Sequence, residues 1–190
     1  METATQVLRK EHDAILKMLG VTDLVAQKLD RREAVAPETL SGLLEFFRLF
    51  ADTCHHGKEE DLLFPMLEKK GLPRAGGPIG VMLWEHDKGR ALIREMASAA
   101  EAYRSGDAAS GPRWALAATG YADLLREHIM KENEILFVMA ERMLSDAEQR
   151  ELAAAFDKVE VEKMGAGTHE RLHALMDKLV AEFTPAAAAR

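Results

Sequence analysis

The chain has 190 residues, with 25 Lys and Arg against 32 Asp and Glu, so its formal net charge is −7. Its length fits one domain, and the acidic excess disfavours nucleic-acid binding, which needs a basic surplus. With a single cysteine, Cys54, and no apolar run near the roughly 20 residues of a membrane span, we expect a cytoplasmic protein that binds neither nucleic acid nor membrane.

Apolar residues recur at helical spacing in five stretches, and Ala, Leu and Met outnumber β-branched residues, which predicts an all-α fold. The predicted helices cover about residues 6–29, 37–71, 78–105, 112–143 and 145–184. The first four predict an up-down-up-down four-helix bundle over residues 1–144. Residues 145–184 predict an additional C-terminal helix that packs on the bundle, and residues 185–190 a flexible tail.

Local sequence signals also predict where the helices bend, begin and are interrupted. Pro65 is expected to kink the second helix, because proline lacks a backbone N–H and clashes with the preceding turn. The fifth helix is expected to begin at the Ser145–Glu148 capping box. We expect an interruption at residues 165–167, after which Thr168 would cap the resumed helix.

The sequence repeats itself at a spacing of 73 or 74 residues. The tripeptide Glu-His-Asp at 11–13 recurs at 85–87, and the ten residues 55–64 recur in altered form at 128–137. Aligning the Leu-Phe pairs of the longer segments matches the histidine that begins each of them, and the glutamate four residues later. The repeat therefore predicts two helical hairpins of the same design.

Six side chains of this repeat are expected to converge inside the bundle. They are His12, His55, Glu59, His86, His128 and Glu132. The predicted helix ends place the histidines of each hairpin at similar heights, and a His–Glu spacing of four puts both side chains on one helix face. Four imidazoles and two carboxylates suit iron, manganese or zinc. Six ligands suit two ions bridged by both carboxylates, so we predict a dinuclear centre with open coordination positions.

At these residues the sequence resembles the hemerythrin family, specifically bacterial proteins with a hemerythrin HHE cation-binding domain. The resemblance covers about residues 8–142 and rests on E-H-D, H-x-x-x-E-E-D-L-L-F-P, E-H-D and H-x-x-x-E-N-E-I-L-F, in that order. It implies that the six residues bind two iron ions in a non-haem di-iron centre, although manganese and zinc would accept the same donors. The expected function is to bind or sense oxygen, nitric oxide or peroxide, or to handle iron.

The pattern departs from the oxygen-carrying hemerythrins at one position. Those proteins have a second histidine four residues after the third-helix ligand, where this chain has Arg90. The pattern is closer to the four-His, two-carboxylate set of iron-sulfur-centre repair proteins, which carry a Cys-rich segment that residues 1–7 do not resemble. A repair protein and an oxidase or peroxidase-like enzyme therefore stay open as alternatives, as does a homo-oligomer.

Three further residues are candidates to assist the site. His56 lies about 100° around the helix from the preceding ligand, so we expect it at the surface or outside the ligand set. Tyr121 lies two turns before the fourth-helix histidine and is expected in the core, with a hydroxyl able to reach a ligand at the metals. His169 would be an extra ligand if the fifth helix folds over the bundle. Residues 169–173 spell the H-E-x-x-H of zinc metalloproteases, but no third ligand follows, so we do not predict a protease.

Overall fold

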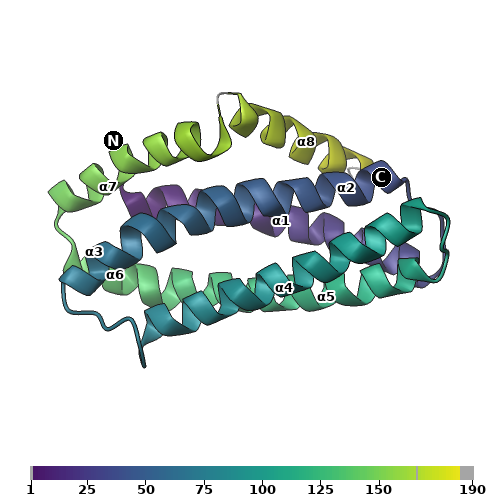
Figure 1. Cartoon of the computed structure of the whole chain (residues 1–190). Helices are drawn as coiled ribbons and strands as arrows, with labels where there is room; N and C mark the ends of the chain where they lie inside the picture. Colours follow the sequence, from purple (N-terminus) through teal and green to yellow (C-terminus); the bar gives the residue numbers. More distant parts are fainter. Residues whose placement is uncertain (1, 166, 185–190) are drawn as a thin grey trace, which may run out of the picture.

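The structure is a computed structural model that describes residues 2–165 and 167–184. The tail expected at residues 185–190 lies outside the described residues. Four helical rods form the body of the molecule (Figure 1). In chain order they comprise α1 (Ala4–Asp30); α2 (Pro37–Phe46), η1 (Phe47–His56), η2 (Glu59–Leu63) and α3 (Phe64–Lys69); α4 (Pro78–Arg104); and α5 (Ser110–Lys131), η3 (Glu132–Leu136) and α6 (Phe137–Met143). Among the described helices, none has the length and apolarity needed to cross a membrane.

The rods pack as an antiparallel bundle, as the sequence predicts. Contacts join α1 to α5, α5 to α4, α4 to α2, and η1 back to α1, so the four rods close a ring. Gly71 and Gly106 follow the second and third rods with φ of +100° and +95°, a left-handed conformation that glycine adopts without strain. Pro78 is the first residue of α4, where its missing N–H removes no helical hydrogen bond.

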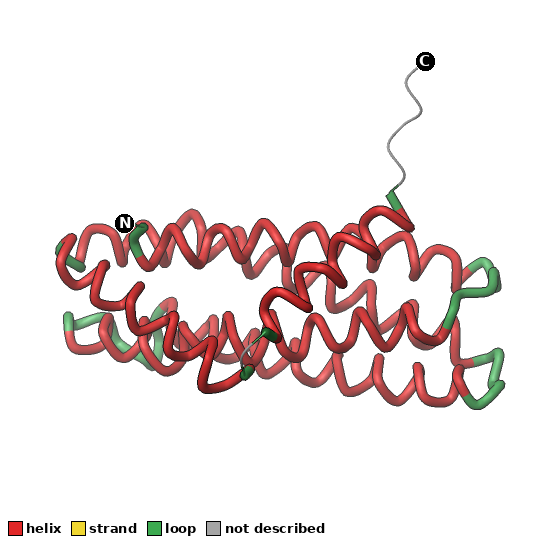
Figure 2. The backbone as a smooth tube through the Cα atoms, turned by 90° about the horizontal axis from the view of Figure 1, so that it is seen from above, coloured by secondary structure: helices red, strands yellow, loops and turns green. Residues whose placement is uncertain are grey.

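The predicted C-terminal extension is present as two helices that lie along the bundle. They are α7 (Asp146–Val159), continued by the π-helical η4 (Glu160–Met164), and α8 (Thr168–Phe183). Ser145 forms the expected capping box with Glu148. The two helices meet at a turn near the middle of the bundle, visible in Figures 1 and 2.

The prediction that Thr168 caps the resumed helix is wrong. Gly167 occupies the capping position with a left-handed φ of +79°, and it has no side chain to accept a hydrogen bond. Thr168 is already helical, and its hydroxyl donates to the carbonyl of Met164. The turn between the two helices therefore depends on glycine conformation at Gly165 and Gly167, and not on a side-chain cap.

Buried apolar residues form two clusters in the part of the chain that the structure describes. One includes Ile15, Phe50 and Ile129, and the other includes Leu8 and Leu63. In the first three rods the predicted ligands lie between residues of one cluster and those of the other, and in the fourth Glu132 lies between Ile129 and Leu136. The extension reaches both clusters, because α7 contributes to one and α8 to the other. The polar site is thus enclosed between two apolar layers.

Candidate metal centre

The six predicted ligands come together between the apolar clusters, and each is at most 2% exposed. Glu132 Oε2 lies 3.2 Å from Nε2 of both His12 and His128. Glu59 lies 3.6 Å from His55 Nε2 through one oxygen and 3.5 Å from His86 Nε2 through the other. Each carboxylate therefore lies between a histidine of the first hairpin and a histidine of the second.

Several polar atoms at this centre have no hydrogen-bond partner in the described part of the chain. They are Nε2 of His12, Nε2 of His55 and all four carboxylate oxygens of Glu59 and Glu132. Leaving such buried atoms unpaired costs free energy, so native structures rarely contain a cluster of them. Nitrogen and oxygen donors in this number fit divalent cations, which would supply the missing partners.

The outer nitrogen of every predicted histidine ligand is held by a hydrogen bond. The four pairs, from Nδ1 to the acceptor oxygen, are His12–Asn133 (3.0 Å), His55–Glu11 (2.8 Å), His86–Glu60 (2.6 Å) and His128–Glu85 (2.9 Å). Such a bond fixes the ring orientation and directs the lone pair of Nε2 toward the centre of the bundle. All four imidazoles are therefore oriented in the way that metal-binding histidines usually are.

These four acceptors obey the internal repeat, and each of them is adjacent in the sequence to a predicted ligand. Glu11 and Glu85 each precede the first histidine of a hairpin, and each binds the second histidine of the same hairpin. Glu60 and Asn133 each follow the predicted glutamate ligand, and each binds the first histidine of the other hairpin. The aligned repeat is the feature of the sequence from which these four hydrogen-bond acceptors could have been predicted.

The backbone widens at the same repeat position in both hairpins. The π-helical segments η2 and η3 begin at the two glutamates, Glu59 and Glu132. Pro65 follows the first segment, but Val138 occupies the equivalent position after the second, so the widening does not require proline. Isolated π-helical turns are often found at functional sites.

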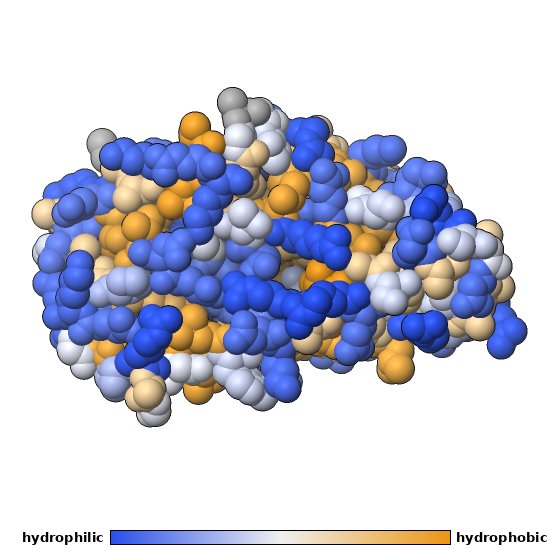
Figure 3. Space-filling model, in the orientation of Figure 1, coloured by the Kyte–Doolittle hydropathy of each residue, from blue (hydrophilic) through white to orange (hydrophobic). Residues whose placement is uncertain are grey.

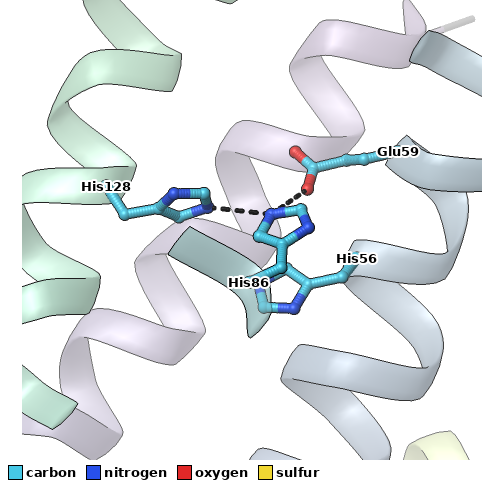
Figure 4. A group of neighbouring side chains, drawn as sticks. All are labelled: His56, Glu59, His86 and His128. Carbon is cyan, nitrogen blue, oxygen red and sulfur yellow. Dashed lines mark hydrogen bonds and ion pairs between the residues drawn. The ribbon is translucent and has the colours of Figure 1, made fainter. Parts of the chain in front are cut away.

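Of the two positions expected for His56, the surface is wrong, because the side chain is buried. His56 is buried, and its ring stacks on that of His86 with centroids 3.8 Å apart (Figure 4). Ligand atoms of His56, Glu59, His86 and His128 lie within 4.8 Å of one another. The estimate of 100° per residue holds for an α-helix, whereas η1 is π-helical up to His56 and turns less per residue.

The other two candidates lie apart from the six ligands. Tyr121 is buried against Phe47, with ring centroids 4.9 Å apart, and its hydroxyl makes no hydrogen bond to any described residue. His169 is partly exposed and packs on Phe50. It belongs to none of the three groups of potential ligands among the described residues. The nearest link from His169 to the site is through Glu160, whose carboxylate lies 4.0 Å from His169 Nε2.

Burial and neighbouring charges shift the pKa values of the buried histidines and glutamates, and so determine which of these side chains carry a proton. Burial lowers the pKa of His55 and of His86, so both imidazoles are neutral and their Nδ1–H groups donate outward. Burial opposes a charge on His128, but the Glu132 carboxylate outweighs it and raises the pKa of His128 to about 9. Burial and then the charge of Glu132 raise the pKa of Glu59 well above its usual range. Protons thus occupy positions that a cation would need.

This proton distribution predicts that metal affinity increases with pH. Below pH 9 the metal-free protein holds a proton on His128 that binding must release, so affinity should rise about tenfold per pH unit between pH 6 and 8. Calorimetry in two buffers of different ionisation enthalpy would report at least one released proton per chain at pH 7. An affinity that does not change over this pH range would refute the prediction.

A buried lysine connects the C-terminal extension to the centre. Lys58 is fully buried and forms ion pairs with both Glu11 and Glu160. Glu11 in turn holds His55, so the path Glu160–Lys58–Glu11–His55 joins η4 to a predicted ligand. Its repeat equivalent, from Lys131 through Glu85 to His128, forms no ion pair with a described residue of the extension. The extension thus makes the two hairpins inequivalent.

Cys54, beside the first hairpin's second histidine, should be unreactive in the folded protein. Burial raises its pKa to about 12, Lys58 opposes this rise, and Glu11 and Glu160 add to it. The thiolate fraction is then about a thousandfold below that of an ordinary thiol. A thiol reagent at neutral pH should modify Cys54 only after denaturant is added. Rapid labelling of the native protein would contradict this expectation.

A four-helix bundle that encloses oriented histidines and unpartnered carboxylates defines the class of helical-bundle proteins with an internal metal site. More specifically, the chain belongs to the hemerythrin HHE cation-binding domain family, whose family model matches residues 3–140. This membership confirms the family resemblance and the all-α bundle predicted from the sequence. It also implies a metal at the His/Glu cluster.

Curated relatives of this chain include iron-sulfur cluster repair proteins. The chain is 31% identical over 148 residues to the iron-sulfur cluster repair protein YtfE of Escherichia coli O81 (strain ED1a). It is 30% identical over 148 residues to the protein of that name in Escherichia fergusonii. Each alignment covers 73% of this chain and 65% of the relative, so about a third of each relative lies outside the similarity.

Proposed function

We propose that this chain is a non-haem di-iron protein whose centre binds oxygen, nitric oxide or peroxide. The observation that carries the proposal is the orientation of the four histidines. Each Nδ1 is held from outside, while the Nε2 atoms face two buried carboxylates whose oxygens lack partners. Iron is favoured over manganese and zinc by the family to which the chain belongs.

We assign the ligands by hairpin. His12 and His55 would hold one ion and His86 and His128 the other, with Glu59 and Glu132 between them. This assignment is supported by the distances from each carboxylate to histidines of both hairpins. When bound, the iron pair supplies open coordination positions and electrons for a small ligand. The protein's own contribution is to fix the imidazoles through Nδ1 and to exclude water with the two apolar clusters.

A second candidate function is iron-sulfur cluster repair, favoured by the similarity to iron-sulfur cluster repair proteins. A repair protein must release iron to an acceptor, whereas a carrier or sensor must retain it through many cycles of ligand binding. An oxidase or peroxidase-like enzyme would instead consume peroxide or oxygen in the presence of an electron donor. The three functions therefore differ in the fate of iron and ligand.

Titration of anaerobic, iron-loaded protein with oxygen and with nitric oxide tests the proposal. We expect a saturable change in the absorption spectrum that reverses when the ligand is removed, with the iron content unchanged. Loss of iron to an added apo iron-sulfur protein would support repair, and sustained turnover of peroxide would support an enzyme. If neither ligand nor peroxide changes the spectrum of iron-loaded protein, the proposal is wrong.

A further inference from the structure

We propose that a pocket beside the metal centre binds a small organic acid through its carboxylate. The pocket lies between η1 and α4, has a volume of about 200 Å³, and includes the buried side chains of His56 and Tyr121 in its lining. Figure 3 shows a hollow near the middle of the visible face, with hydrophobic surface inside and strongly hydrophilic surface on both sides. None of the six proposed metal ligands lines the pocket, so the inference does not depend on the proposed function.

The entrance of the pocket carries an excess of positive charge. Arg48 and Arg94 are exposed at its rim, and neither lies within 4 Å of a carboxylate of any described residue. Arg90 also lines the pocket, but its guanidinium binds Asp52 at 2.8 Å and Glu60 at 2.7 Å. Two arginines are therefore free to bind an anion, and arginine is well suited to the two oxygens of a carboxylate.

The inner end of the pocket offers a hydrogen-bond donor with no partner. Burial raises the pKa of Tyr121, so its hydroxyl stays protonated. That hydroxyl makes no hydrogen bond to the described residues, while Asp52 Oδ1 is already bound by Arg90 and by His56 Nδ1. The one carboxylate on the wall is thus neutralised, and the donors left over favour an anionic ligand.

The walls favour an organic anion over a bare inorganic one. Phe47, Ile93 and the ring of Tyr121 line the pocket, and Gly89 adds no side chain that would narrow it. A cavity of about 150 Å³ is enough to hold benzene, so about 200 Å³ admits a ring or a short chain. An inorganic oxyanion would leave these apolar surfaces without contacts.

A ligand in the pocket would act on the metal centre through His56. His56 lines the pocket, and its ring stacks on the ring of His86, a predicted metal ligand. Occupancy of the pocket would therefore change the surroundings of His56 directly and those of His86 through His56. The pocket is the place where a bound acid could alter the properties of the metal centre.

Calorimetric titration of the purified protein with benzoate, benzyl alcohol and inorganic phosphate tests the proposal. We expect saturable binding of benzoate, with benzyl alcohol and phosphate each at least tenfold weaker. The paired substitution Arg48→Gln with Arg94→Gln should weaken benzoate binding at least tenfold. Tyr121→Phe, which keeps the ring and removes only the hydroxyl, should weaken it about threefold to tenfold. Arg142→Gln, an exposed arginine on α6 outside the pocket, is the control and should leave the affinity unchanged.

Each contrary result rejects a stated part of the inference. Absence of saturable benzoate binding would overturn it entirely. An unchanged affinity in both the arginine pair and Tyr121→Phe would show that benzoate binds elsewhere, including directly at the metals, and would also overturn it. Phosphate binding as tight as benzoate would reject the organic acid. Metal content measured on the same samples separates failure of this inference from failure of the di-iron proposal.

Discussion

Replacing Glu59 with leucine is expected to abolish metal binding while stabilising the metal-free protein by about 1–3 kcal/mol. Both carboxylate oxygens of Glu59 are buried without a hydrogen-bond partner in the described part of the chain. An apolar side chain of similar size removes that penalty, as it often does when it replaces a buried ionisable group. The same change removes a proposed ligand that lies between the two hairpins. Stability and metal binding should therefore change in opposite directions.

Two measurements check this expectation. Denaturant unfolding of the metal-free proteins should give the larger free energy for Glu59→Leu, and metal titration should show an affinity more than about 100-fold below wild type, beyond the loss caused by disturbing an outer hydrogen bond. Glu127→Leu is the matched control, because Glu127 is exposed and adjacent to His128. It should keep its metal. A Glu59→Leu variant that binds metal as wild type does would remove Glu59 from the ligand set.

Replacing Lys58 with methionine is expected to destabilise the protein by about 3–5 kcal/mol. Lys58 is fully buried and pairs with two carboxylates, Glu11 and Glu160. Burial already raises the pKa of Glu11, and Lys58 opposes that rise, so its loss leaves Glu11 without its main counter-charge. A loss of this size is a large fraction of the 5–15 kcal/mol that stabilises a typical domain.

The internal repeat provides the control for this variant. Lys131 occupies the equivalent position and pairs with Glu85, but its side chain is 29% exposed and no residue of the extension contacts it among the ion pairs found. Lys131→Met should therefore cost about 1 kcal/mol or less. Chemical denaturation of the two variants measures the difference. Equal losses would show that the extension does not reinforce the first hairpin through Lys58.

The sequence was sufficient to predict the bundle, because helical periodicity and strong breakers at Gly71, Pro78 and Gly106 are local signals. It was also sufficient to bring six polar side chains together, since the repeat fixes both their helix face and their height. Family membership confirms the fold. The ligand roles themselves stay a proposal, supported by the geometry around each imidazole.

Other features depend on information that a helical-wheel argument does not contain. His56 is buried at the end of the π-helical η1, and no residue pattern in this stretch predicted a π-helix. The pairing of Lys58 with Glu160 joins residues 102 positions apart in the sequence, so it depends on how the extension docks. The hydrogen bonds of Glu11, Glu60, Glu85 and Asn133 cross between helices. From the sequence, only the internal repeat could have indicated that these four hydrogen bonds form two equivalent pairs.

The most direct test of the dinuclear centre is native mass spectrometry of the chain after anaerobic incubation with excess ferrous iron. We predict a mass that exceeds the metal-free chain by two iron ions, replaced by the metal-free mass in the Glu59→Leu variant and retained in Glu127→Leu. A wild-type chain that binds no iron, or only one ion, would contradict the proposal that the four histidines and two glutamates hold a pair of metals.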